Sequence, residues 1–340
     1  MKPFRNHLRA LTRVIAFCAI TAFFYLLWAC ITPLLLVSEK ASYWWRNFNF
    51  RTWARLTNTL LRMRVEARGT PPRAPFFLVS NHLSYMDIVA FAAQLDCVFI
   101  AKSEVAGWPV LGLLCRSMGT IFVDRNSRMD VLRVNRLIEQ ALHSGKGVLL
   151  FPEGTSTPGA EVLPFHSALL EPAVQQGCPV SFATVSYRTP VGQPPAHLSV
   201  CWWGEMSFMT HFYRLLHLNS AEATLVFGSY SIRADDRKVL ARKLWQAVNE
   251  EFIPAVENDS PMEHGRARYS PLTKGAARST RGLSQASSRQ PPEGSRPPSL
   301  CLLSPFPKGD FKRKHAKHSL THPTEHWSAQ AGLGSPERTG

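Results

Sequence analysis

The chain has 340 residues, of which 45% are hydrophobic and 19% charged, so most of it can fold around a core of ordinary size. This composition excludes a disordered acidic chain and a collagen. The net charge of +15 is confined to the ends: residues 1–69 carry 11 basic and 2 acidic side chains, residues 257–340 carry 13 and 7, and residues 70–256 are neutral. A DNA-binding domain should carry its excess charge on the folded core, so we expect no nucleic-acid partner.

The seven cysteines are scattered, and none forms a C-x-x-C pair. This pattern excludes a disulfide scaffold and a structural zinc site, and it indicates a reducing compartment. Neither a P-loop nor a dinucleotide-binding G-x-G-x-x-G motif is present. We therefore expect no bound cofactor.

The first element is an apolar run from Val14 to Val37 that contains no charged residue. About 20 apolar residues can cross a bilayer, so this run predicts a membrane segment; it is too long for the core of a cleaved signal peptide. Four basic residues flank it on each side, and the positive-inside rule therefore gives no orientation. Two arrangements stay open: one tilted span, or a re-entrant pair of short helices broken near Pro33.

The next stretch, residues 42–66, alternates aromatic and apolar residues with arginines at helical spacing. Such a helix suits the headgroup region of an anionic membrane, where rings are buried and arginines meet lipid phosphates. A helix that packs on the folded domain with a solvated arginine face fits the pattern equally well. Residues 1–69 are therefore expected to form a membrane anchor and an interfacial helix.

Residues 70–256 have an α/β pattern. Short apolar runs at residues 75–80, 97–102, 119–124, 147–152 and 179–187 predict buried strands, and residues 129–146 predict a helix that ends near Gly145. Alternating strands and helices indicate a largely parallel sheet covered by helices. In such sheets the chemistry collects in the loops after the carboxyl ends of the strands.

The loop after the first of these strands contains His82 and, five residues later, Asp87. On one straight helix the two side chains would diverge by about 140°. If His82 instead lies in the loop and a helix begins near Ser84, Asp87 can turn back to the imidazole, fix its tautomer and stabilise its protonated form. Since the G-x-S-x-G motif of a serine nucleophile is absent, the simplest use of such a pair is to deprotonate a substrate hydroxyl. A capped helix start is the structural alternative.

Two further loops follow predicted strands. Arg125 follows residues 119–124, where its guanidinium can hold a phosphate or carboxylate through two hydrogen bonds. The third loop reads F-P-E-G-T-S from Phe151 to Ser156. In it Gly154 permits close backbone approach, and Thr155 and Ser156 offer donors to an anion. Taken singly, these loops are also compatible with a surface ion pair and an ordinary turn.

Taken together, N-H-x-x-x-x-D, G-x-I-F-V-D-R and F-P-E-G-T, in that order, resemble the glycerolipid acyltransferase family, which includes the 1-acyl-sn-glycerol-3-phosphate and lysophospholipid acyltransferases. Ala101-Lys102, the G-W-P-V-L-G run and C-P-V-S-F-A-T-V-S-Y support the match, which spans about residues 71–227. The resemblance implies an enzyme that transfers an acyl group from acyl-CoA or acyl-carrier protein to the hydroxyl of a lysolipid. The expected first acceptor is 1-acylglycerol-3-phosphate, which gives phosphatidate.

The resemblance also implies roles for individual residues. His82 would be the general base and Asp87 its orienting partner, while Pro179 and its strand would line the apolar side of the site. The expected substrate-binding residues are Lys102, Arg125, Glu153, Gly154, Thr155 and Ser156. No metal is expected, because thioester alcoholysis needs a base, an oriented hydroxyl and oxyanion donors.

One position departs from the family pattern. Members that use glycerol phosphate commonly continue the third motif with arginine, E-G-T-R, and this chain has Ser156 there. Lyso-ornithine lipid and lysophospholipids are therefore alternative acceptors. Two alternatives of another class are a membrane lipid esterase and a non-catalytic lipid-binding protein. We expect the catalytic domain at the cytoplasmic face of the inner membrane, close to anionic lipids.

Residues 257–340 are rich in Pro, Ser, Gly and Arg and predict a disordered basic tail. Four histidines lie at spacings of three and four residues, but Pro323 interrupts the helix that would align them: His315, His318, His322 and His326. We therefore predict no metal site in this segment.

Overall fold

The computed structural model describes residues 2–35, 37–108 and 110–256. The tail and its histidines lie outside the described residues, so the predictions for them stay predictions. The helices and short 3-10 turns are α1 (Lys2–Ile31), η1 (Thr32–Leu35), α2 (Glu39–Leu61), α3 (Met86–Ala92), η2 (Ser103–Gly107), α4 (Leu111–Ser117), α5 (Arg128–His143), η3 (Ala168–Leu170), α6 (Glu171–Gln175), α7 (Ala196–Ser199), α8 (Phe208–His217) and α9 (Arg237–Glu251). The strands are β1 (Met63–Arg68), β2 (Phe76–Ser80), β3 (Cys97–Lys102), β4 (Ile121–Val123), β5 (Gly147–Leu150), β6 (Val180–Arg188) and β7 (Ala221–Ile232).

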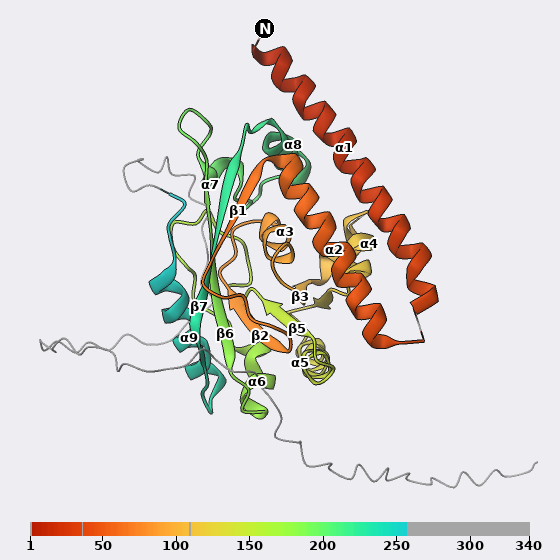
Figure 1. Ribbon diagram of the computed structural model, residues 1–340. Coiled ribbons are helices and arrows are strands. Elements are labelled where there is room, and N and C mark those ends of the chain that lie inside the picture. Colours follow the sequence, from red (N-terminus) through yellow and green to blue (C-terminus); the bar gives the residue numbers. More distant parts are fainter. Residues whose placement is uncertain (1, 36, 109, 257–340) are drawn as a thin grey trace, which may run out of the picture. The chain divides into compact units, whose positions relative to one another are not determined.

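The seven strands form one sheet in the order β1-β7-β6-β2-β5-β3-β4 (Figure 1). Every neighbouring pair is parallel except β6 and β7, which are antiparallel. This confirms the expected α/β class with a largely parallel sheet. Alternate residues of each strand face opposite sides, so Leu78 joins one core and Phe77 the other. Helices α2 and α3 cover the first side, and α5, α6 and α9 cover the second.

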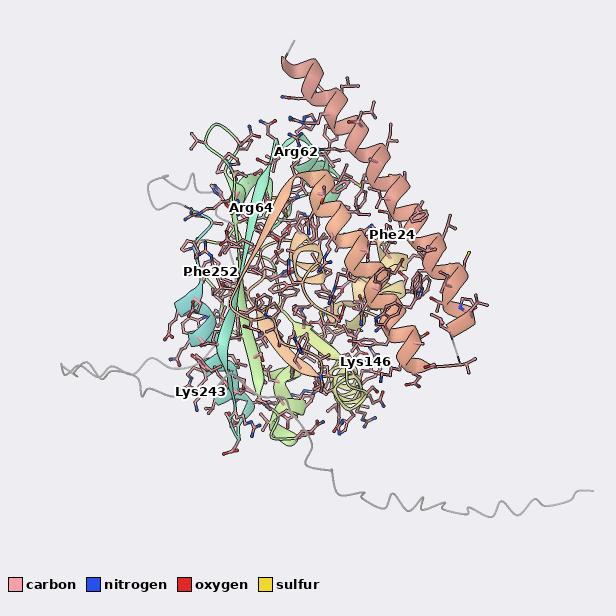
Figure 2. All side chains as sticks on the ribbon, viewed as in Figure 1. Phe24, Arg62, Arg64, Lys146, Lys243 and Phe252 are labelled. Carbon is pink, nitrogen blue, oxygen red and sulfur yellow. The ribbon has the colours of Figure 1, made fainter. Side chains whose placement is uncertain are left out.

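The N-terminal segment also contributes a strand to the sheet. β1, which lies inside the segment expected to be only an anchor, pairs along its whole length with β7 and forms the edge of the catalytic sheet. Arg62 makes this possible: its left-handed backbone (φ 52°) ends α2 and turns the chain into the strand, where Figure 2 shows it beside Arg64. The alternating charges of β1 hid this strand, because they also fit the solvated face of a helix.

Helix α2 packs on the domain. Its buried face includes Phe50, Trp53 and Leu61, while Trp44 and Phe48 remain exposed on the other side. The inner face of α2 therefore packs on the domain, as one of the two interpretations of residues 42–66 expected. Its outer face still has exposed aromatic side chains that could contact a membrane.

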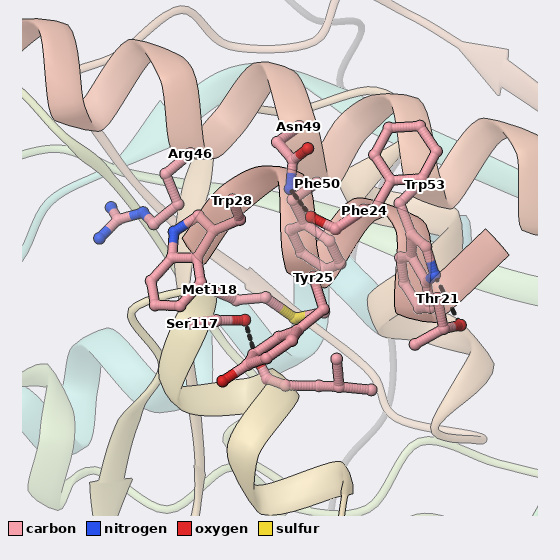
Figure 3. Close-up of a pocket in the computed structure, with 11 residues that line it drawn as sticks. Thr21, Phe24, Tyr25, Trp28, Arg46, Asn49, Phe50, Trp53, Ser117 and Met118 are labelled. Carbon is pink, nitrogen blue, oxygen red and sulfur yellow. Dashed lines mark hydrogen bonds between the residues drawn. The ribbon is translucent and has the colours of Figure 1, made fainter. Parts of the chain in front are cut away.

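Helix α1 is unbroken to Ile31, the short η1 turn that contains Pro33 follows it, and α2 begins at Glu39. The two helices lie against one another: Asn49 donates to the Phe24 carbonyl, and Trp53 Nε1 donates to Thr21 Oγ1 at 3.1 Å (Figure 3). Residues 6–35 contain a segment long and apolar enough to cross a bilayer, and only 6% of its most apolar window is buried in the protein. Most of α1 is thus free to meet lipid.

Candidate active site

The carboxyl ends of β2 and β5 bring the first and third motifs together. β2 ends at Ser80 and β5 at Leu150, so the loops that begin at Asn81 and Phe151 leave the sheet side by side. Asn81 is fully buried and ties its loop to β6 through two hydrogen bonds: its amide nitrogen donates to the Val185 carbonyl, and its side-chain oxygen accepts from the Val185 amide. The first loop is therefore anchored one residue before His82.

His82 lies in the loop and α3 begins at Met86, which allows Asp87 to turn back as the spacing predicted. The Nδ1 atom of His82 lies 2.7 Å from Asp87 Oδ2. Asp87 is fully buried, whereas the His82 side chain is 22% exposed. Since Nδ1 faces Asp87, Nε2 is the ring nitrogen that remains for a substrate. The imidazole also stacks on Phe151, with centroids 4.3 Å apart, which fixes the plane of the ring.

The Asp87 carboxylate is shared by four donors. Oδ2 accepts from the backbone N–H groups of Leu83 and Ser84 as well as from His82, and Oδ1 accepts from the Tyr187 hydroxyl at 2.7 Å. Burial, reinforced by the Asp87 charge, raises the pKa of Tyr187 far above its ordinary value, so the phenol keeps its proton and donates. Tyr187 was missed in the sequence. The only sequence feature that marks it is a phenolic hydroxyl at the end of a run of apolar residues.

Glu153 closes the first loop onto the third. Its Oε1 accepts from the His82 backbone N–H at 2.7 Å, and its Oε2 accepts from the Leu163 N–H at 2.9 Å. The residue is only 3% exposed, and this burial raises its pKa to about 8 although both backbone donors favour the carboxylate. Both oxygens are used within the protein. The sequence placed Glu153 among the substrate contacts, but here its carboxylate holds the backbone of His82.

Arg125 reaches the third loop from the end of β4, where its Nη1 donates to the Gly154 carbonyl. Gly154 has a left-handed backbone (φ 80°), and a β-carbon there would come within 2.9 Å of that guanidinium nitrogen. The left-handed turn favours glycine, and a side chain there would also displace the Arg125 guanidinium. Thr155 is exposed beside it, whereas Ser156 is buried.

Lys102 ends β3 at the same edge, but it is exposed and paired with Glu104 at 2.7 Å. The structure thus connects His82, Asp87 and Glu153 directly and joins Arg125 to Gly154. Among the described residues, Lys102, Thr155 and Ser156 form no hydrogen bond or ion pair with any of these five residues.

An aromatic cluster that the sequence analysis did not identify covers one side of the His82 loop. It comes mainly from residues 189–220, the segment between β6 and β7, whose Trp202 amide donates to the Leu83 carbonyl at 2.9 Å. Tyr85 of the His82 loop meets the rings of Trp202 and Phe208, and its hydroxyl lies 3.0 Å from His211 Nδ1. A base with an orienting carboxylate therefore lies beside an apolar wall, which suits a substrate with a polar end and a long apolar chain.

A family model described as Acyltransferase matches residues 62–186, the part of the chain that holds all three motifs. A lyso-ornithine lipid O-acyltransferase of Pseudomonas aeruginosa is 34% identical over 221 residues, which cover 65% of this chain and 80% of that protein. The chain belongs to the acyltransferase family. A 1-acyl-sn-glycerol-3-phosphate acyltransferase of Neisseria gonorrhoeae is 32% identical and covers 58% of this chain and 76% of that protein.

The fold of this acyltransferase also matches a solved structure. The crystal structure of the 1-acyl-sn-glycerophosphate acyltransferase of Thermotoga maritima superimposes with a TM-score of 0.54 at 21% identity and covers 74% of this chain and 97% of that one. At this identity the match concerns the fold, which agrees with the parallel sheet flanked by helices. The family membership and the exposed apolar helix α1 together support membrane association.

Proposed function

We propose that this acyltransferase moves an acyl group from a thioester, acyl-CoA or acyl-carrier protein, to the free hydroxyl of a lysolipid, with 1-acylglycerol-3-phosphate as the first acceptor. The observation that carries the proposal is the 2.7 Å contact between His82 Nδ1 and the buried Asp87 carboxylate, which leaves Nε2 toward the substrate. Relatives named for lysolipid acceptors support the acceptor class.

In the proposed reaction, His82 Nε2 takes the proton from the lysolipid hydroxyl while that oxygen attacks the thioester carbonyl carbon. Asp87 stabilises the imidazolium that forms, since its charge lies against Nδ1. The tetrahedral intermediate then collapses, the C–S bond breaks, and the leaving thiolate takes the proton from the imidazolium. A new ester and a free thiol are the products, and the enzyme returns to its starting state.

Two other residues have positioning roles in this proposal. Tyr187 donates to Asp87, and Glu153 accepts from the backbone N–H of His82, so neither needs to contact the acceptor. Arg125 is our candidate for the phosphate or carboxylate of the headgroup, with Thr155 and Lys102 as exposed neighbours on the same edge. The active site would face the cytoplasm at the inner membrane, where acyl-CoA and acyl-carrier protein are found.

A lyso-ornithine lipid is the second candidate acceptor. Ser156 stands where glycerol-phosphate members carry arginine, and it is buried, so it gives the headgroup no guanidinium. Relatives from Pseudomonas aeruginosa and Rhodobacter capsulatus, both named lyso-ornithine lipid O-acyltransferase, are 34% identical to this chain.

The test offers a panel of lysolipids and labelled acyl-CoA to membranes that contain the full chain, and it measures thiol release and labelled product. We expect thiol release to depend on added lysolipid and to be lost in His82→Gln. Ester hydrolysis without a thioester donor would instead identify an esterase, and unchanged lipid binding without any thiol release would identify a binding protein.

The same panel with Ser156→Arg, and with Ser156→Ala as its size control, separates the acceptors. If 1-acylglycerol-3-phosphate is the acceptor, the wild-type chain should acylate it faster than the other lysolipids in every membrane preparation. A preference for lyso-ornithine lipid that shifts toward glycerol phosphate only in Ser156→Arg would assign the second acceptor instead.

A further inference from the structure

A cavity lies away from the motif loops, between the start of α1, the loop before α7, and α8. Its volume is about 900 Å³, within the range of about 300–1,000 Å³ that is usual for ligand sites. Four of its lining side chains are cationic or can become so, and no acidic residue lines it: His7, Arg9, Arg214 and His217. The cavity is therefore electropositive.

Helix α1 passes α8 at this place (Figure 1), and arginines hold the two together. Arg13 is buried and donates to the carbonyls of Leu216 and Leu218, and Arg9 donates to the His217 carbonyl and the Asn219 side chain. These carbonyls belong to the last turn of α8, where a helix carries partial negative charge and unpaired acceptors. The docking uses backbone acceptors, so it leaves the positive charge of the arginines without a carboxylate.

Several donors in the cavity still lack a partner. Among the described residues, Arg9 Nε and His217 Nε2 are buried without a hydrogen bond, and Arg214 forms no ion pair. The His7 and His217 rings lie edge to face with centroids 5.0 Å apart, and Tyr213 completes the group with its hydroxyl 3.0 Å from His7 Nδ1. Burial and the nearby charges of His7 and Arg9 lower the pKa of His217. An anion would relieve both the repulsion and the missing hydrogen bonds.

The surroundings identify the kind of anion. Arg13 is the last charged residue before the uncharged run Val14–Val37, so the cavity lies at the height where the apolar part of α1 begins. Leu198 lines the cavity and is exposed, and four more large apolar side chains close in sequence to lining residues are exposed: Leu8, Leu11, Val191 and Met209. A cationic cavity next to exposed apolar side chains suits a molecule that has a phosphate beside acyl chains. A soluble phosphate would make no contact with the apolar side chains.

We propose that this cavity binds the phosphate headgroup of an anionic phospholipid of the surrounding bilayer, as a second, non-catalytic lipid site. The site goes beyond the acyl-transfer reaction and does not depend on which lysolipid is acylated. Its occupant clamps α1 to α8 at the membrane surface and neutralises the charges that the docking arginines leave exposed.

The test uses the full chain purified in detergent and counts bound phosphatidylglycerol by native mass spectrometry during a lipid titration. Variants are Arg214→Gln, His217→Gln and the double variant; Lys243→Gln on α9 (Figure 2) removes one exposed positive charge outside the cavity. Circular dichroism verifies that each variant is folded. We expect the double variant to bind phosphatidylglycerol about tenfold or more weakly, and Lys243→Gln to match the wild type.

Three competitor arms identify the source of the anion. Phosphatidylcholine, which carries no net charge, and oleate, which has a carboxylate and no phosphate, should not replace the bound phosphatidylglycerol. Adenosine 3′,5′-bisphosphate, the soluble phosphate part of a CoA, should not displace it either; displacement would assign the cavity to the acyl donor and overturn the lipid assignment. Equal phosphatidylglycerol binding by the double variant and the wild type would overturn the site itself.

Discussion

Two regions of this acyltransferase use buried polar groups in opposite ways. At the His82 loops, the carboxyl oxygens of Asp87 and Glu153 accept hydrogen bonds from backbone N–H groups. At the start of α1, the guanidinium groups of Arg9 and Arg13 donate to backbone carbonyls at the end of α8. The carboxyl groups are enclosed and fully used, which fixes the geometry needed for catalysis. Arg9 lines a cavity with unused donors, which suits a region that meets an external anion.

The largest effect is expected from Asp87→Asn, which changes the catalytic region of this comparison. The amide can accept at only one of its two ends, so it cannot serve the backbone, His82 and Tyr187 together, and its NH₂ group would face other donors. We expect the rate of acyl transfer to fall about 10⁴-fold, as when the orienting carboxylate of a catalytic triad is replaced by an amide. Initial rates of thiol release from folded protein measure it.

The matched control for that variant is Asp96→Asn, which removes a partly exposed carboxylate paired with Arg51 at 2.6 Å. Such pairs contribute little, so its rate should stay close to that of the wild type. A loss of rate as large as that of Asp87→Asn would mean that general damage, rather than the His82 pair, explains both.

On the other side of the comparison, Arg13→Met should destabilise the docking of α1. The substitution keeps an apolar stem but leaves the Leu216 and Leu218 carbonyls without their buried donor. Hydrogen bonds to charged groups contribute about 1.5–3 kcal/mol, and we expect a loss of this order in the free energy of unfolding. Thermal unfolding in detergent measures it, with the exposed Arg128→Met as control. Equal melting temperatures would contradict a structural role of Arg13.

Tyr187→Phe tests the hydrogen bonds of the catalytic region, because it removes one hydroxyl and keeps the ring. Without this donor, the Asp87 carboxylate has one hydrogen bond fewer to hold it against His82 Nδ1. We expect kcat to fall about tenfold with little change in KM, because the contacts with the substrate are unchanged. Tyr230→Phe, on the partly exposed end of β7, is the control. An unchanged kcat, or an equal change in kcat and KM, would reduce Tyr187 to a packing residue.

The last prediction concerns Glu153 and the pH dependence of stability. Its pKa of about 8 in the folded protein lies above the 4.5 of an exposed carboxyl, so the folded state holds this proton more tightly than the unfolded chain. The stability that it contributes is present below about pH 4.5 and is lost as the pH rises to about 8. Glu153→Gln cannot ionise, so the melting temperature of the wild type should fall relative to this variant over that interval. A constant difference between the two would contradict the raised pKa.

The catalytic region could be predicted from sequence because its signals are local. Apolar runs stop at polar residues where strands end, and the five-residue spacing of His82 and Asp87 requires a loop followed by a helix. Partners distant in sequence could not be found in this way. Tyr187 reaches Asp87 from 100 residues away, and Glu153 reaches His82 from 71. Their roles depend on the neighbouring positions of β2, β5 and β6, which no local pattern specifies.

The α1 region was harder to interpret for a different reason. A basic residue beside an apolar run has the same pattern whether it is solvated, bound to lipid or hydrogen-bonded to a helix end, so Arg9 and Arg13 gave no sign of α8. Likewise, β1 looked like the end of a helix because its partner β7 lies more than 150 residues later, and residues 189–232 had been given no predicted element. Only the pairing of β1 with β7 separates these possibilities.

The aromatic segment between β6 and β7 connects two antiparallel strands at the rim of the sheet. Because both of its ends are fixed by a continuous strand ladder, its length and side chains can change through evolution without moving Asn81, His82 or Asp87. Its hydrogen bond and ring contacts with the catalytic loop are to Leu83 and Tyr85. A lineage could therefore exchange this wall to accommodate a different lipid while it inherits the same proton-transfer apparatus.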